Sequence, residues 1–183
     1  TLFRSHVSAV PNAQTGRISP LKTRADVALF GTFGYELDPR TVTDEAEREQ
    51  IRRQVALDKR FAALVATGDF YRLISPFASE PAFAMAHAAW MVVSPDRREA
   101  LVGYYRTHVG VNLMPFHLRL AGLDRDAAYT VEEIGFDTNP WRPRRGDELE
   151  EIGLPFIDGS AGEWKSKIPG GDNISRLFHL TAR

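Results

Sequence analysis

The stretch from Ser5 to Asp38, SHVSAVPNAQTGRISPLKTRADVALFGTFGYELD, decides the fold of the first part of the chain. It opens with residues 6–10, in which apolar and polar side chains alternate as they do along a strand. The alternation stops at Pro11, which has a fixed φ and no N–H to donate to a strand ladder. The stretch therefore begins with a short predicted strand.

A helix and a second strand follow. Ser19–Pro20 is a strong helix start, because Ser caps free amides and Pro leaves no N–H unpaired, so we expect a helix over 21–29. The aromatic and glycine-rich run 29–35 suits a second strand. A long amphipathic helix capped by Thr43 is predicted over 44–67. The order strand, helix, strand, helix predicts a parallel sheet with helices packed outside it, as in an open α/β sheet or a (β/α) barrel.

The sequence pattern changes after a turn-rich stretch at 75–81, where we place the boundary between two domains, 1–76 and 77–183. Beyond it, short apolar runs alternate with turn signals, which predicts an antiparallel β-sandwich. The predicted strands cover 88–93, 100–108, 116–120, 129–134 and 173–181. Pro- and Gly-rich segments at 139–149 and 157–162 are expected to be loops. The predicted fold class is thus α/β plus all-β.

Composition is typical of a soluble globular protein of one or two domains. The chain has 183 residues, of which 43% are hydrophobic, and a formal net charge of -1. This balance gives no indication of a nucleic-acid partner. The absence of cysteine excludes disulfides and thiolate metal sites and fits a reducing compartment. We therefore expect a cytoplasmic location, and because the sequence has no long apolar run, we expect no membrane partner.

Three blocks in the opening stretch resemble the end of the catalytic barrel in bacterial α-galactosidases of glycoside hydrolase family 36. They are HVSAVPN-x-QTGR at 6–17, PLKTR-x-DVA at 20–28 and FGTFGYELD at 30–38. The resemblance continues into GDELEEIGL at 146–154 and SRLFHL at 175–180. It implies that the chain comprises the last βα units of a (β/α)8 barrel followed by a C-terminal antiparallel β-sandwich.

The resemblance also implies a reaction, the retaining hydrolysis of terminal α-galactosyl residues of oligosaccharides. Retaining glycosidases use two carboxyl groups roughly 5 to 5.5 Å apart, one as nucleophile and one as acid/base. In the family, both catalytic aspartates lie upstream of the block at 6–17, so we expect this chain to hold no catalytic residue and to be inactive alone. An α-galactoside oligosaccharide as ligand, no cofactor, and self-association into a homo-oligomer are further implications.

Candidate site residues lie in and after the first two strands. His6, Asn12 and Gln14 are the substrate-binding candidates: His6 could be structural or lie at a pocket edge, and the two amides could reach sugar hydroxyls or pin a turn. Glu36 and Asp38 follow the second strand, where barrel enzymes keep their chemistry. Acidic residues at such positions more often solvate a loop or cap the next helix.

No metal site is predicted, because the histidines of the second half lack ligand spacing. These are His87, His108, His117 and His179. Trp141 and Trp164, on predicted loops, could be carbohydrate platforms, subunit contacts or loop anchors. The motif Gly146–Leu149 is not expected to be catalytic. An alternative function is a stand-alone carbohydrate-binding or oligomerisation β-sandwich module.

Overall fold

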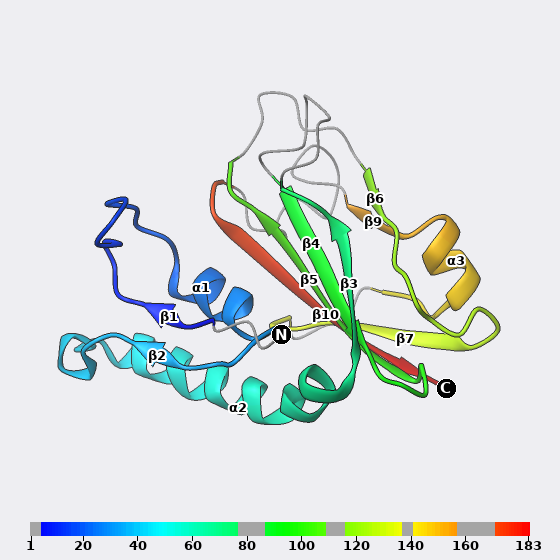
Figure 1. The fold of residues 1–183 in the computed structure, drawn as a ribbon, viewed down its shortest axis with the longest axis horizontal. Helices are drawn as coiled ribbons and strands as arrows, with labels where there is room; N and C mark the ends of the chain where they lie inside the picture. Colours follow the sequence, from blue (N-terminus) through cyan, green and yellow to red (C-terminus); the bar gives the residue numbers. More distant parts are fainter. Residues whose placement is uncertain (1–4, 77–86, 109–115, 137–140, 157–170) are drawn as a thin grey trace. The chain divides into compact units, whose positions relative to one another are not determined.

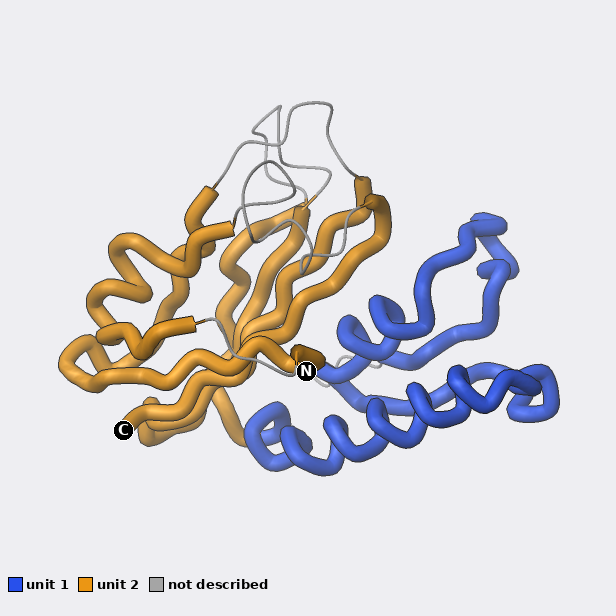
Figure 2. Tube along the Cα trace, turned by 180° about the vertical axis from the view of Figure 1, so that it is seen from behind, with its two compact units in different colours: residues 1–66 blue, residues 67–183 orange. Residues whose placement is uncertain are grey.

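The protein is described by a computed structural model, which places residues 5–76, 87–108, 116–136, 141–156 and 171–183. The chain forms two compact units, Thr1–Ala66 and Thr67–Arg183 (Figure 2). Each described unit has its own apolar cluster and its own sheet.

The first unit contains a parallel pair of short strands. Its elements are β1 (Val7–Ser8), α1 (Leu21–Ala28), β2 (Tyr35–Glu36), the 3-10 helix η1 (Pro39–Thr41) and α2 (Glu45–Thr67) (Figure 1). Val7 pairs with Tyr35 and Ser8 with Glu36 in parallel register. The predicted order of strand, helix, strand and helix, with parallel pairing, is confirmed.

Two details of the first unit differ from the prediction. Pro20 occupies the N-cap of α1 without a side-chain cap, and the carbonyl of Ser19 instead accepts a hydrogen bond from Nε of Arg24 at 3.1 Å. The second strand is shorter than 29–35, because the amides of Leu29 and Gly31 still donate to carbonyls at the end of α1. Those amides are therefore not available to a strand ladder.

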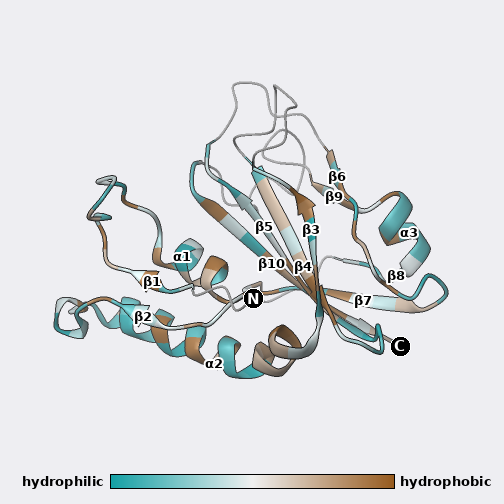
Figure 3. Ribbon diagram, in the orientation of Figure 1, coloured by the Kyte–Doolittle hydropathy of each residue, from teal (hydrophilic) through white to brown (hydrophobic). Residues whose placement is uncertain are grey.

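The apolar cluster of the first unit lies between its strands and helices. Val7 packs with three residues of α1, namely Leu21, Ala25 and Ala28, and Phe33, Tyr35, Leu37 and Ile51 pack against them. The helix α2 carries hydrophilic and hydrophobic bands along its length, as an amphipathic helix does (Figure 3). Its first turn is capped by Asp44, whose Oδ1 accepts from the amide of Ala46 at 3.1 Å, and not by Thr43 as predicted.

The second unit is built on antiparallel sheet. Its elements are β3 (Asp69–Ile74), β4 (His87–Val93), β5 (Glu99–Arg106), β6 (Phe116–Leu118), β7 (Ala128–Glu133), β8 (Arg144–Arg145), α3 (Gly146–Glu151), β9 (Leu154–Phe156) and β10 (Ile174–Ala182). Among the described residues, a six-stranded sheet has the order β3-β4-β5-β10-β7-β8, and β6 pairs with β9 in a two-stranded sheet. All these pairings are antiparallel.

One face of the large sheet packs on a second layer formed by β6, β9 and α3 (Figure 1). Tyr104, Tyr129 and Phe178 of the sheet are fully buried in one cluster with Leu149 of α3 and Phe156 of β9. The predicted antiparallel two-layer architecture is confirmed in these coarse terms. The second layer is not a complete sheet: the strand pair β6 and β9 forms one part of it, and the helix α3 forms the other.

Two predictions for this half need correction. The units divide between Ala66 and Thr67, upstream of the predicted boundary at 76/77, because β3 pairs with β4 and so belongs to the second unit. The segment 139–149 is not entirely a loop, since Gly146 begins α3. Acidic residues in the first turn of α3 and the burial of Leu149 favour the helix over a loop. The segment 157–162 and Trp164 lie outside the described residues.

Candidate functional site

The parallel pairing of β1 and β2 brings His6 and Glu36 together. The ladder runs from the Val7 amide to the Gly34 carbonyl at 2.7 Å and from the Ala9 amide to the Glu36 carbonyl at 3.0 Å. Across it, Nε2 of His6 lies 2.7 Å from Oε2 of Glu36. The His6 side chain is 50% exposed and that of Glu36 is 74% exposed. A candidate histidine and a candidate carboxylate thus form one open, hydrogen-bonded pair.

Asn12 organises the loop that follows β1. Its Oδ1 accepts hydrogen bonds from the amides of Gln14 and Thr15, at 3.1 and 3.0 Å, and from the Thr15 hydroxyl at 3.0 Å. Its backbone also bonds to Arg17 and Gly16, which closes the turn. The side-chain oxygen of Asn12 therefore pins the turn, while Gln14 lies exposed at its tip.

Asp38 has a local role at the start of η1. Its carboxylate accepts from the Arg40 amide at 3.0 Å and pairs with the Arg40 guanidinium at 2.8 Å. Hydrogen bonds from Arg40 hold the pKa of Asp38 below its usual value. Glu36 and Asp38 thus have different partners, and Asp38 acts as the helix-capping residue that the sequence left open.

Arg24 is the residue in this region that sequence reasoning missed. Its guanidinium donates to the Ser8 carbonyl at the end of β1 and, through Nε, to the Ser19 carbonyl. Next to it on α1, Lys22 pairs with the buried carboxylate of Asp26 at 2.5 Å. These contacts explain why the PLKTR-x-DVA block carries charges in a largely packed helix. Only the placement of α1 beside β1 in the folded chain could have revealed them.

Tyr35 lies beneath the His6–Glu36 pair on the other face of β2 and offers a pH test. Its hydroxyl donates to Oε1 of the buried Gln54 at 2.8 Å. Burial, followed by the negative charge of Asp58, raises the pKa of Tyr35 to about 12.

We expect Tyr35→Phe to remove one phenol ionisation with a midpoint of about 12 from the absorbance titration of the protein. Since an unperturbed tyrosine ionises near pH 10, the folded state favours the neutral phenol. The stabilising contribution is therefore complete below about pH 10 and is lost as the pH rises through about 12. Loss of an ionisation with a midpoint near 10 would contradict this assignment.

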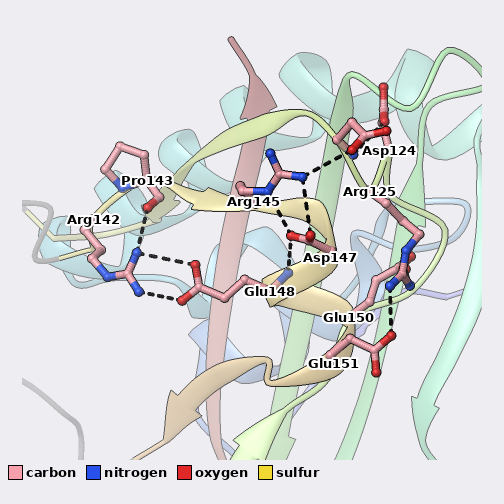
Figure 4. A network of polar contacts seen from close by, with 10 residues as sticks. Asp124, Arg125, Arg142, Pro143, Arg145, Asp147, Glu148, Glu150 and Glu151 are labelled. Carbon is pink, nitrogen blue, oxygen red and sulfur yellow. Dashed lines mark hydrogen bonds and ion pairs between the residues drawn. The ribbon is translucent and has the colours of Figure 1, made fainter.

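The motif Gly146–Leu149 sits in a network of ion pairs around α3 (Figure 4). Figure 4 shows Arg142 facing Glu148, and Arg125 beside Glu150 and Glu151. The remaining pairs are Arg144 with Glu148 at 2.6 Å, and Arg145 with Asp126 and Asp147, both at 3.2 Å. Most of these side chains are exposed, so solvent weakens most of these ion pairs. Asp147 and Glu148 of the motif thus have arginine partners within this network.

The other sequence candidates in the second unit are also engaged in packing. Nε1 of Trp141 donates to the buried Glu133 at 3.1 Å, and its ring meets Phe178 edge-on. Trp141 therefore anchors its segment to the sheet and is not an open platform. His87 bonds to Tyr104, and His179 contacts two glutamates.

Candidate metal sites and membrane-spanning helices are absent from the part of the chain that the structure describes. No group of three or more His, Cys, Asp or Glu side chains within it could hold a metal ion. Of the helices in those same residues, none is long and apolar enough to cross a membrane.

The chain is similar to α-galactosidases along almost all of its length. Residues 1–68 match the Melibiase family model, and residues 87–180 match the model of the glycosyl hydrolase family 36 C-terminal domain. Alpha-galactosidase AgaA of Geobacillus stearothermophilus is 49% identical over 154 residues, which cover 83% of this chain and 19% of AgaA.

Crystal structures agree with this similarity. A substituted form of AgaA in complex with raffinose is 42% identical to this chain with a TM-score of 0.79, covering 97% of this chain and 21% of AgaA. Another, in complex with stachyose, is 41% identical with a TM-score of 0.80, covering 98% and 22%. The chain thus spans only about a fifth of these proteins. The chain belongs to glycosyl hydrolase family 36, with residues 87–180 forming its C-terminal domain.

Proposed function

We propose that this chain is the C-terminal part of a retaining α-galactosidase that hydrolyses terminal α-galactosyl residues of oligosaccharides. The observation that carries the proposal is the pair of family matches, Melibiase at 1–68 and the family 36 C-terminal domain at 87–180, in this order along the chain. Its similarity to enzymes named α-galactosidases supports the activity. The raffinose and stachyose complexes of AgaA support oligosaccharides as the substrate class.

In this proposal, the first unit supplies the last βα units of a (β/α)8 barrel. The parallel pairing of β1 and β2, with α1 connecting them, supports this assignment. Asn12 and Gln14 then lie in the loop after a barrel strand, at the substrate side. His6 directly precedes β1 and contacts Glu36, which ends β2 at that side. We assign His6 the direct contact with sugar, and Asn12 the shape of the loop that carries Gln14. Self-association of the complete enzyme and its cytoplasmic location belong to the same proposal.

The test compares two proteins on nitrophenyl α-galactoside and raffinose. The first is the 183-residue chain alone. The second is a hybrid enzyme in which this chain replaces the matching segment of AgaA. We expect the hybrid to hydrolyse both substrates and the chain alone to hydrolyse neither, because the catalytic aspartates of the family lie upstream of the block at 6–17.

The control is AgaA with the same junctions and its own segment. A folded hybrid without α-galactosidase activity would contradict the proposed function. Hydrolysis by the chain alone would place a catalytic carboxylate within it, with Glu36 as the first residue to examine.

A further inference from the structure

The two strands of the first unit present one apolar and one polar face. Side chains alternate between the faces of a strand. Val7 and Tyr35 point toward the helices, since they pack in one cluster with Leu21 of α1. His6 is one position before Val7 and Glu36 is one position after Tyr35, so both point to the opposite face. No helix of the described first unit contributes to the contact between them.

Glu36 fixes the orientation of the His6 ring. The 2.7 Å contact joins Oε2 of Glu36 to Nε2 of His6, so Nε2–H donates to the carboxylate. The other ring nitrogen, Nδ1, then points away from Glu36 and is an acceptor in the neutral imidazole. A sugar hydroxyl can both donate and accept, and it therefore suits this nitrogen.

The pair is not needed to hold the fold together. Half of the His6 side chain and most of the Glu36 side chain are exposed, and neither belongs to the apolar cluster. An exposed pair of this kind contributes about 0 to 1 kcal/mol to stability. A role in function can therefore be separated from a role in folding of the first unit.

We infer that Glu36 is a positioning residue, which orients the His6 imidazole so that Nδ1 binds a hydroxyl of the α-galactoside. The inference rests on the proposed function, because it needs the first unit to be part of a barrel. In a (β/α)8 barrel the helices form the outer ring, so the strand face opposite them faces the barrel interior. His6 and Glu36 lie on that face, and Glu36 ends β2, at the carboxyl end from which barrel enzymes bind substrate.

The experiment uses the hybrid enzyme and compares Glu36→Ala, Glu36→Gln and His6→Ala. We expect Glu36→Ala and His6→Ala each to raise KM for nitrophenyl α-galactoside about tenfold with kcat within about twofold, as for a lost binding contact. The double variant with Glu36→Ala and His6→Ala should show no further rise in KM, because both residues act through one contact. Glu36→Gln should restore most of the affinity, since the amide oxygen still accepts from Nε2.

Glu49→Ala is the matched control. Glu49 forms an exposed ion pair with Arg53 on α2, and its loss should leave KM and kcat unchanged. The melting temperature of every variant should stay within about 2 °C of the parent hybrid.

Each other result overturns the inference. An unchanged KM in Glu36→Ala, or additive effects in the double variant, would remove the positioning role. A large fall in melting temperature would make the pair structural, and loss of kcat in Glu36→Gln would make Glu36 a catalytic carboxylate. All four leave the proposed function standing, whereas an inactive parent hybrid contradicts that function itself.

Discussion

Replacing Glu133 by alanine is expected to destabilise the second unit by about 3 to 5 kcal/mol, because it leaves the Arg176 guanidinium buried without its partner. Both side chains are almost fully buried, at 3% and 4% exposure. Arg176 bonds to both carboxylate oxygens, through Nε at 2.7 Å and Nη2 at 2.9 Å. The Trp141 indole adds a third hydrogen bond to the same carboxylate.

Aromatic rings hold the guanidinium in place, so it cannot easily swing into solvent. It lies 4.5 Å from the centroid of the Phe156 ring and 5.1 Å from that of Phe178. Urea unfolding of the second unit measures the loss in its free energy of unfolding. The control is a double variant, Glu133→Leu with Arg176→Met, which removes both charges and should recover most of the stability. A loss below about 1 kcal/mol for Glu133→Ala would show that the pair is solvated and not buried.

The strands of the second unit could be predicted because their signals are local. Alternation along 173–181 predicts one face with Ile174, Arg176, Phe178 and Leu180, and the structure buries Phe178 and Leu180 in the core cluster. That pattern also places Arg176 on the core face. Its partner could not be predicted, since Glu133 is brought to it by the pairing of β10 with β7, which no local signal records.

The boundary and the candidate site show the same limit. The turn residues at 75–81 indicate where the chain bends, but not which sheet β3 joins, and its pairing with β4 decides that. Likewise, His6 and Glu36 are distant in sequence, and only the parallel register of β1 and β2 brings them together. Single candidate residues could thus be found from sequence, whereas their pairing depended on tertiary structure.

The short helix α3 could not be predicted from local sequence either. Proline, arginine and glycine around its start predict a loop, yet Gly146 is needed there for space. Its backbone lies against the 124–127 segment: the Gly146 amide donates to the Ala127 carbonyl at 2.9 Å, and the Asp147 amide donates to that of Arg125 at 3.1 Å. A Cβ at Gly146 would stand 2.0 Å from the Asp124 carbonyl oxygen.

Gly146→Ala is therefore expected to destabilise the second unit by about 3 kcal/mol, the upper end for overpacking, because the clash is with backbone and not with a flexible side chain. Moving the 124–127 backbone away would break the two hydrogen bonds and uncover Leu149, which is fully buried. Gly34→Ala is the matched control, since a Cβ there meets nothing within 4 Å, and it should change stability by no more than about 0.5 kcal/mol. Denaturant unfolding of both variants measures the difference. Equal stability of Gly146→Ala and the parent chain would mean that α3 can shift freely. The close approach of the 124–127 backbone would then not explain the glycine of the motif Gly146–Leu149.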